Sequence, residues 1–70
     1  MKIQIFCDDK GTGYEILYKK DWIDGKDLVP TTSGKKQARD VDVNDRIAVS
    51  STFSYEIKRI VTYYEDTDGI

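Results

Sequence analysis

Polar and apolar residues alternate in two segments near the N-terminus, residues 3–7 and residues 14–18. A period of two is typical of a half-buried strand, and the Asp- and Gly-rich residues 8–13 between them are typical of a turn, so we predict a β-hairpin. One register puts the six apolar side chains on one face. Its pairs are Cys7 with Tyr14, Ile5 with Ile16, and Ile3 with Tyr18. Phe6 and Leu17 fall on the opposite face, as expected for a sheet that curls over on itself.

The next segment contains an Asp-Gly step within residues 23–27, which favours a turn. A two-residue turn would leave Trp22 opposite an aspartate, whereas a wider turn over residues 23–27 sets Trp22 opposite Leu28. We therefore expect the wider turn. Pro30 lacks a backbone donor, which confines its strand to an edge of the sheet or ends it.

Two further segments carry few apolar side chains. Residues 31–40 contain Ala38 as their one apolar residue, and we expect a flexible surface loop there. Residues 65–70 include three acidic side chains, and we expect a frayed, acidic C-terminal end.

The C-terminal half of the chain repeats the hairpin pattern. Pairing Ile47 with Ile57 and Val49 with Tyr55, across a turn at residues 50–54, gathers these four apolar side chains on one face. We therefore predict a second hairpin with this register.

The apolar phase changes after Ile57, because Ile60 is even-numbered whereas Tyr63 is odd-numbered. A β-bulge near residues 58–59, or a sharp bend in a strand that serves two sheets, accounts for the change. A helix over residues 57–64 is the alternative, since several apolar side chains there also match helical spacing. The Thr, Val, Ile and Tyr content favours the strand.

These elements predict an all-β fold: a small, strongly bent antiparallel sheet or a partly open barrel of about five strands. With 70 residues, the chain is expected to form one domain over residues 1–70. Residues 39–61 combine an alternating pair, a tight acidic turn and a long strand, and they resemble Src-homology-3-like small barrels. Asn44 stands where such turns often have Gly, and Asn also accepts a positive φ. The resemblance implies a bent barrel and no particular function.

The composition excludes most kinds of catalytic site. With one cysteine and no histidine, the chain lacks a disulfide, a Cys/His zinc site, and Ser/His or Cys/His nucleophile pairs. Cys7 lies at an apolar position of the first strand, where we expect a buried, unreactive thiol. The aspartates do not fit a calcium-binding loop, because Lys20 and Trp22 occupy positions that should hold ligands. We expect no enzyme activity, no catalytic residue, no cofactor and no metal.

Hydropathy and charge predict a cytoplasmic protein without a membrane segment, and the host cytoplasm if the protein is encoded by a phage. No apolar run approaches the ~20 residues that span a bilayer, and residues 2–7 lack the apolar core of a secretory signal. A single free thiol fits a reducing compartment. The net charge of −2 does not favour a nucleic acid or an anionic membrane as partner.

The aromatic content suggests a function in binding. Five Tyr, two Phe and one Trp are more than so small a core is expected to hide, and Tyr and Trp often anchor interfaces. We expect a non-enzymatic protein-protein interaction module, such as a small phage- or virus-type accessory protein that regulates or inhibits a larger assembly. The expected partner-binding residues are three aromatic and three basic ones: Trp22, Tyr63, Tyr64, Lys35, Lys36 and Arg39.

Other interpretations stay open at this point. A nucleic-acid-binding small barrel, which would use the basic loop and stack bases on Trp22, is the alternative. Tyr63 and Tyr64 would equally serve to close the open end of a barrel. Exposed aromatic side chains would also suit a homodimer.

Overall fold

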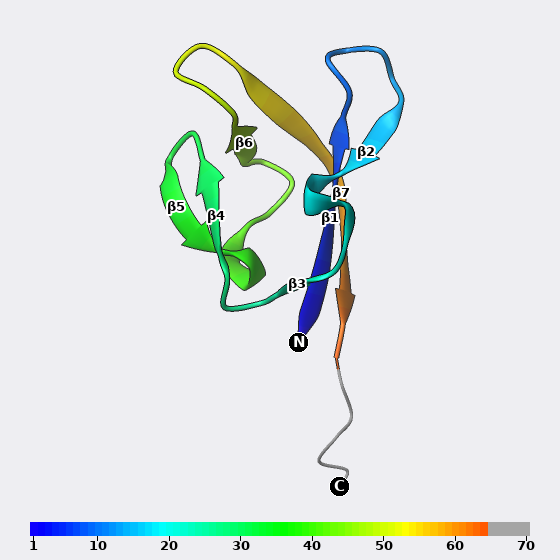
Figure 1. Cartoon of the computed structure of the whole chain (residues 1–70), viewed down its shortest axis with the longest axis vertical. Coiled ribbons are helices and arrows are strands. Elements are labelled where there is room, and N and C mark those ends of the chain that lie inside the picture. The colour runs from blue at the N-terminus through cyan, green and yellow to red at the C-terminus, as the bar shows by residue number, and fades with distance from the viewer. Residues whose placement is uncertain (65–70) are drawn as a thin grey trace, which may run out of the picture.

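The computed structural model describes residues 1–64 (Figure 1). Seven strands form one open antiparallel sheet, and two short 3-10 helices lie between strands. The elements are β1 (Lys2–Asp8), β2 (Glu15–Leu17), η1 (Tyr18–Lys20), β3 (Ile23–Asp24), β4 (Leu28–Thr31), β5 (Gly34–Gln37), η2 (Ala38–Asp40), β6 (Arg46–Ala48) and β7 (Ser54–Tyr63). The predicted all-β class is confirmed, and the sheet is open rather than barrel-closed, with more strands than the expected five. The expected acidic end, residues 65–70, lies outside the described residues.

The strand order is β2-β1-β7-β6-β4-β5, and β3 also pairs with β1. β7 is the longest strand, with ten residues. Its N-terminal end pairs with β6 and the rest pairs with β1, so β7 connects two halves of the sheet (Figure 1). We call residues 28–48 the β6 half, and residues 1–24 together with the C-terminal part of β7 the β1 half.

A β-bulge lies within β7. Phe6 of β1 is opposite Arg59, whereas the next residue, Cys7, is opposite Ile57, so Lys58 has no partner in β1. The extra residue changes the alternation of side chains along the strand. The predicted bulge is therefore confirmed, and this segment is a strand rather than a helix.

The first hairpin keeps the predicted face but not the predicted register. Cys7 lies opposite Ile16 instead of Tyr14, so the pairing is shifted by two residues. The predicted pairs of Ile5 and Ile3 with this strand are wrong as well, because β2 is only three residues long. A shift of two leaves the same side chains on the same face, so the apolar pattern does not separate the two registers. Tyr14, expected in the core, is 76% exposed.

The β6–β7 hairpin is shifted in the same way. Ile47 lies opposite Tyr55 rather than Ile57. The turn closes one residue earlier than predicted, because the Val49 N–H donates to the Phe53 carbonyl at 3.0 Å. Val49 therefore belongs to the turn and is exposed.

The wide turn that would set Trp22 opposite Leu28 is not formed. Ile23 pairs with Ile3 of β1 and is buried, whereas Leu28 begins β4 in the other half and is exposed. The predicted turn would have left Ile23 in a loop, and burying this large apolar side chain is favourable. A tighter turn over residues 24–27 then carries the chain to the β6 half.

Residues 31–40, expected to be a flexible loop, instead include the end of β4, a two-residue turn, β5 and η2. Ala38 is fully buried. Its N–H donates to the Asp27 carbonyl at 2.8 Å, which fixes the start of η2 against the preceding turn. The buried Ala38 and the pairing of β5 with β4 thus order a segment whose composition is otherwise that of a loop.

β4 is not an edge strand, although it contains Pro30. It lies between β5 and β6, but its pairing with β6 is limited to Thr31 opposite Ile47. In this register Pro30 would face Ala48, and proline has no N–H to donate. Pro30 thus shortens the ladder instead of placing the strand at the edge.

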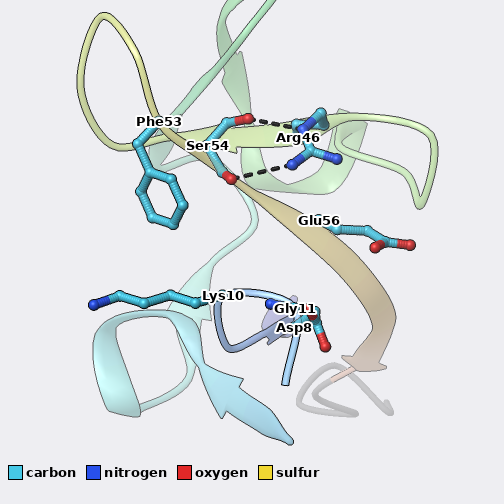
Figure 2. Close-up of a pocket in the computed structure, with 7 residues that line it drawn as sticks. All are labelled: Asp8, Lys10, Gly11, Arg46, Phe53, Ser54 and Glu56. Atoms are coloured by element: carbon cyan, nitrogen blue, oxygen red, sulfur yellow. Dashed lines mark hydrogen bonds between the residues drawn. The ribbon is translucent and has the colours of Figure 1, made fainter. Parts of the chain in front are cut away.

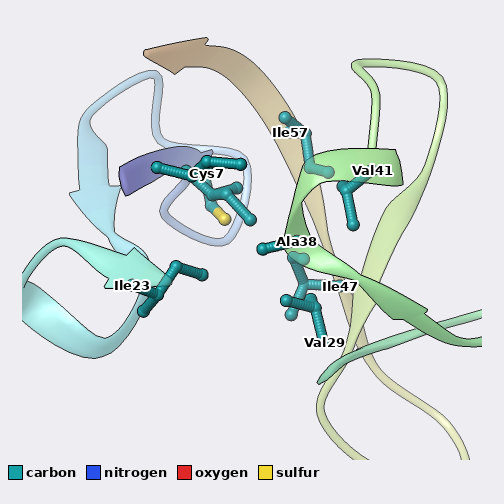
Figure 3. Packing of buried hydrophobic residues seen from close by; sticks show 9 residues of the cluster. Cys7, Ile23, Val29, Ala38, Val41, Ile47 and Ile57 are labelled. Atoms are coloured by element: carbon teal, nitrogen blue, oxygen red, sulfur yellow. The ribbon is translucent and has the colours of Figure 1, made fainter. Parts of the chain in front are cut away.

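The core lies between the two halves of the sheet (Figure 3). The β1 half and β7 contribute Ile3, Ile5, Cys7, Ile23 and Ile57, and the β6 half contributes Val29, Ala38, Val41 and Ile47. Cys7 is buried, as predicted. The two halves share one apolar cluster.

Candidate functional site

Two of the predicted partner-binding residues lie together on the β1 half. The rings of Trp22 and Tyr63 have centroids 6.0 Å apart and planes inclined by 54°. The two side chains come from β7 and from the residue just before β3, which are on opposite sides of β1. The Trp22–Tyr63 pair therefore crosses over β1.

Strand alternation explains why these rings point away from the core. Ile23 and Ile3 are buried partners, so Trp22, next to Ile23, projects to the other face. Tyr63 is opposite Lys2, the neighbour of Ile3, and lies on that face too. The apolar residues here, which we call the outer face, are Phe6, Leu17, Trp22, Val61 and Tyr63.

The outer face also carries cations, Lys2 opposite Tyr63 and Arg59 opposite Phe6. The Arg59 guanidinium lies 3.9 Å from the centre of the Phe6 ring, and its Nε is 3.2 Å from a carboxylate oxygen of Glu15. Residues opposite each other in an antiparallel pair share a face, which brings Arg59 over Phe6. The outer face thus combines aromatic rings with an oriented guanidinium.

Exposure is greatest at the aromatic end of the outer face. Trp22 is 40% exposed and Tyr63 is 55% exposed, although both rings have large apolar surfaces. The core cluster packs on the opposite side of β1, against Ile3 and Ile5. Tyr64 follows β7 and is exposed, and among residues 1–64 its ring forms no stacking contact with another aromatic ring.

The predicted basic residues lie elsewhere. Lys35 and Lys36 are on β5, at the far end of the strand order. The Lys36 ammonium is 2.9 Å from a carboxylate oxygen of Asp45, and this hydrogen bond raises the pKa of Lys36. The Asp45 carboxylate also accepts the Asp42 N–H at 3.0 Å. This backbone bond and the lysine lower the pKa of Asp45.

Arg39 is also engaged locally. Its Nε donates to the Gln37 side-chain oxygen at 2.8 Å, and its backbone N–H donates to the Gly25 carbonyl at 3.0 Å. Together with the Lys36–Asp45 pair, these contacts stabilise the β5–η2 segment. The three basic residues therefore do not join Trp22 in one basic groove.

A hollow of about 200 Å³ lies between the β1–β2 loop and the β6–β7 hairpin (Figure 2). Its lining carries both signs of charge, with Asp8 and Glu56 as acidic groups and Lys10 and Arg46 as basic groups. This volume is below the usual range for small-molecule sites. Two of the four charged groups, Asp8 and Arg46, are also committed to the local structure.

Asp8 holds the loop at this hollow. One carboxylate oxygen accepts the Gly11 N–H at 2.6 Å and the other accepts the Gly13 N–H at 3.0 Å. Both glycines have a positive φ, which favours glycine over other residues. Across the hollow, Arg46 donates to the hydroxyl and the carbonyl of Ser54 at 2.7 and 3.1 Å. These side chains stabilise the two turns.

The described residues offer no arranged nucleophile or metal cluster. Burial raises the pKa of the Cys7 thiol to about 11, so the reactive thiolate is disfavoured at neutral pH. Within residues 1–64, no three acidic or thiol side chains are grouped to hold a metal ion. Neither short helix in this part of the chain has the length and apolar run of a membrane-spanning helix.

Comparison of the chain with protein-family models, curated proteins and solved structures finds no match. Sequence reasoning singled out Trp22 and Tyr63 but missed Arg59, Phe6 and Leu17 as their neighbours. The alternation did contain a signal for this surface, because it places Phe6 and Leu17 on the face of their strands that points away from the core.

Proposed function

We propose that the protein is a non-enzymatic protein-protein interaction module that binds its partner through the outer face. The observation that carries this proposal is the exposed Trp22–Tyr63 pair, held over β1 by strand pairing. Rings fixed in this way lose little conformational freedom on binding, which favours their use as anchors.

The residue types of the outer face support a protein as partner. Trp, Tyr and Arg are the residues that most often dominate binding energy at protein interfaces. Trp22 and Tyr63 occupy one end of the face and Arg59 stacks on Phe6 further along β1. A partner with an apolar pocket for the rings and an acceptor for the guanidinium would complement this face.

The absence of an arranged nucleophile within residues 1–64 supports a binding role over catalysis. Cys7 is buried with a raised pKa, and Asp8 accepts two backbone hydrogen bonds in its loop. A small domain with one binding face would act by occupying a surface of a larger assembly. Regulation or inhibition of such an assembly is the activity we propose, as in phage- or virus-type accessory proteins.

A nucleic acid is a poorer fit than a protein. Lys36 is paired with Asp45 and Lys35 lies on the edge strand β5, whereas binding to single strands needs a continuous basic groove beside the aromatic rings. The likeness of residues 39–61 to Src-homology-3-like small barrels favours neither partner, because many functions occur on such folds.

The test compares Trp22→Ala and Tyr63→Ala with Tyr14→Ala as a matched control. Tyr14 is a more exposed aromatic residue in the β1–β2 loop. Immobilised wild-type protein is used to capture partners from an extract of the source organism, and a stoichiometric partner is then purified. Calorimetric titration should show an affinity loss of at least about tenfold for the two outer-face variants and none for Tyr14→Ala.

Three results would contradict the proposal. One is the lack of any stoichiometric protein partner, and another is unchanged affinity in both outer-face variants. The third is a saturable change in Trp22 fluorescence on adding single-stranded DNA at low salt, which would favour the nucleic-acid alternative.

A further inference from the structure

One edge of β7 is unpaired along its C-terminal part. From Arg59 to Tyr63 the strand pairs with β1 on one side, while β6 pairs on the other side only as far as Glu56. Within residues 1–64 no other strand pairs with this edge. In Figure 1, this part of β7 runs beside β1.

We propose that this edge pairs with the same edge of a second copy of the chain, forming a two-fold symmetric dimer. An unpaired strand edge presents backbone donors and acceptors that readily add another strand. Pairing β7 with β7 would join the sheets of two copies into one continuous antiparallel sheet. The proposal uses backbone groups of an edge, so it does not depend on the function proposed for the outer face.

The composition of the edge distinguishes it from the two ends of the strand order. β2 is three residues long and includes Glu15, and β5 carries Lys35 and Lys36. Short length and charge are common protections against unwanted pairing. The run Ile60–Tyr64 has no charge and consists of β-branched and aromatic residues, the composition that favours strand pairing.

An antiparallel two-fold contact uses the same residues on both chains. Pairing centred on Thr62 keeps this contact within β7 and Tyr64, which the structure describes.

This register matches the uncharged side chains. It places Val61 opposite Tyr63 of the second copy and Ile60 opposite Tyr64, with Thr62 opposite itself. Aromatic–β-branched and Thr–Thr pairs are among the favourable cross-strand pairs. Because this pairing occupies the β7 edge of both copies, neither edge can bind a third copy, and the assembly is a dimer.

The test measures the mass of the full chain in solution by sedimentation equilibrium, from about 10 μM to about 1 mM. We expect the mass to rise from 8.1 kDa towards twice this value. Thr62→Lys, which sets two like charges together at the two-fold axis, should keep the protein monomeric at the highest concentration. The matched control is Thr32→Lys, at an exposed residue between β4 and β5, which should dimerise like wild type.

A charge exchange tests the register. Thr62→Glu should also be monomeric by itself, whereas an equimolar mixture of Thr62→Lys and Thr62→Glu should dimerise, because this register places Thr62 opposite itself. Far-UV circular dichroism confirms that each variant is folded. A wild-type protein that stays monomeric up to about 1 mM would overturn the proposal. So would a folded Thr62→Lys variant that dimerises as well as wild type, or a mixture of the two Thr62 variants that stays monomeric.

Discussion

Val29 offers a sharp test of the idea that both halves of the sheet share one core. It is fully buried in β4 of the β6 half, whereas Trp22 lies in the β1 half. Val29→Ala removes two buried carbons, which costs about 1.6 kcal/mol in transfer free energy at about 0.8 kcal/mol each. The remaining cavity raises the loss in unfolding free energy to about 2–3 kcal/mol. The total for a chain of this length is only about 4–10 kcal/mol.

The assay is urea unfolding followed by Trp22 fluorescence and by far-UV circular dichroism. With a slope of about 1 kcal/mol per M for so small a domain, the midpoint should fall by about 2–3 M. Because the core is shared, both signals should move together, although the mutation and the fluorophore are in different halves. The coincidence of the two curves is the critical observation.

Val43→Ala is the matched control, because Val43 is 54% exposed and loses the same two carbons. We expect a change of less than about 0.5 kcal/mol there. The reasoning would be refuted if Val29→Ala left the fluorescence transition in place while circular dichroism resolved two steps. Such a result would mean that the halves unfold independently.

Further predictions concern individual side chains. Lys36→Glu should lower the urea midpoint by setting two carboxylates together, whereas Lys35→Glu, at an exposed position, should not; equal effects would contradict the ion pair. The lowered pKa of Asp45 means that its stabilisation is present above the ordinary value of about 3.9 and is lost as pH falls through the folded-state pKa. Midpoints of wild type and Asp45→Asn should therefore differ near neutral pH and converge in acid; a constant difference would contradict this. Cys7 should react with a thiol reagent only on unfolding, and rapid labelling of the folded protein would show that the thiol is accessible.

The sequence correctly predicted that Ile3, Ile5, Cys7, Ile47 and Ile57 face the core, but not which residues pair, and Tyr14 and Val49, assigned to the same faces, are exposed. In both hairpins the observed register differs from the predicted one by two residues. Such a shift preserves the faces, so hydrophobic alternation carries no information about it. The register of each hairpin depends on its turn. The Asp8 carboxylate holds the first turn, and the Val49–Phe53 hydrogen bond closes the second.

The candidate site was predicted as separate residues rather than as a surface. Trp22 and Tyr63 meet because β3 and β7 both pair with β1. Trp22 was expected to pair locally with Leu28, and nothing in the local pattern indicates the longer-range partner. Arg59 was missed because its face depends on the position of the bulge in β7, which the sequence located only approximately.

The antiparallel pairing of β1 with β7 also determines how the molecule responds to force. Lys2 and Tyr63 are opposite each other, at the same end of the strand pair (Figure 1). A load applied between these two residues would pull perpendicular to both strands and open the backbone bridges one after another, instead of shearing them all at once. The domain should therefore unzip at low force from this end, with the Trp22–Tyr63 contact among the first to separate.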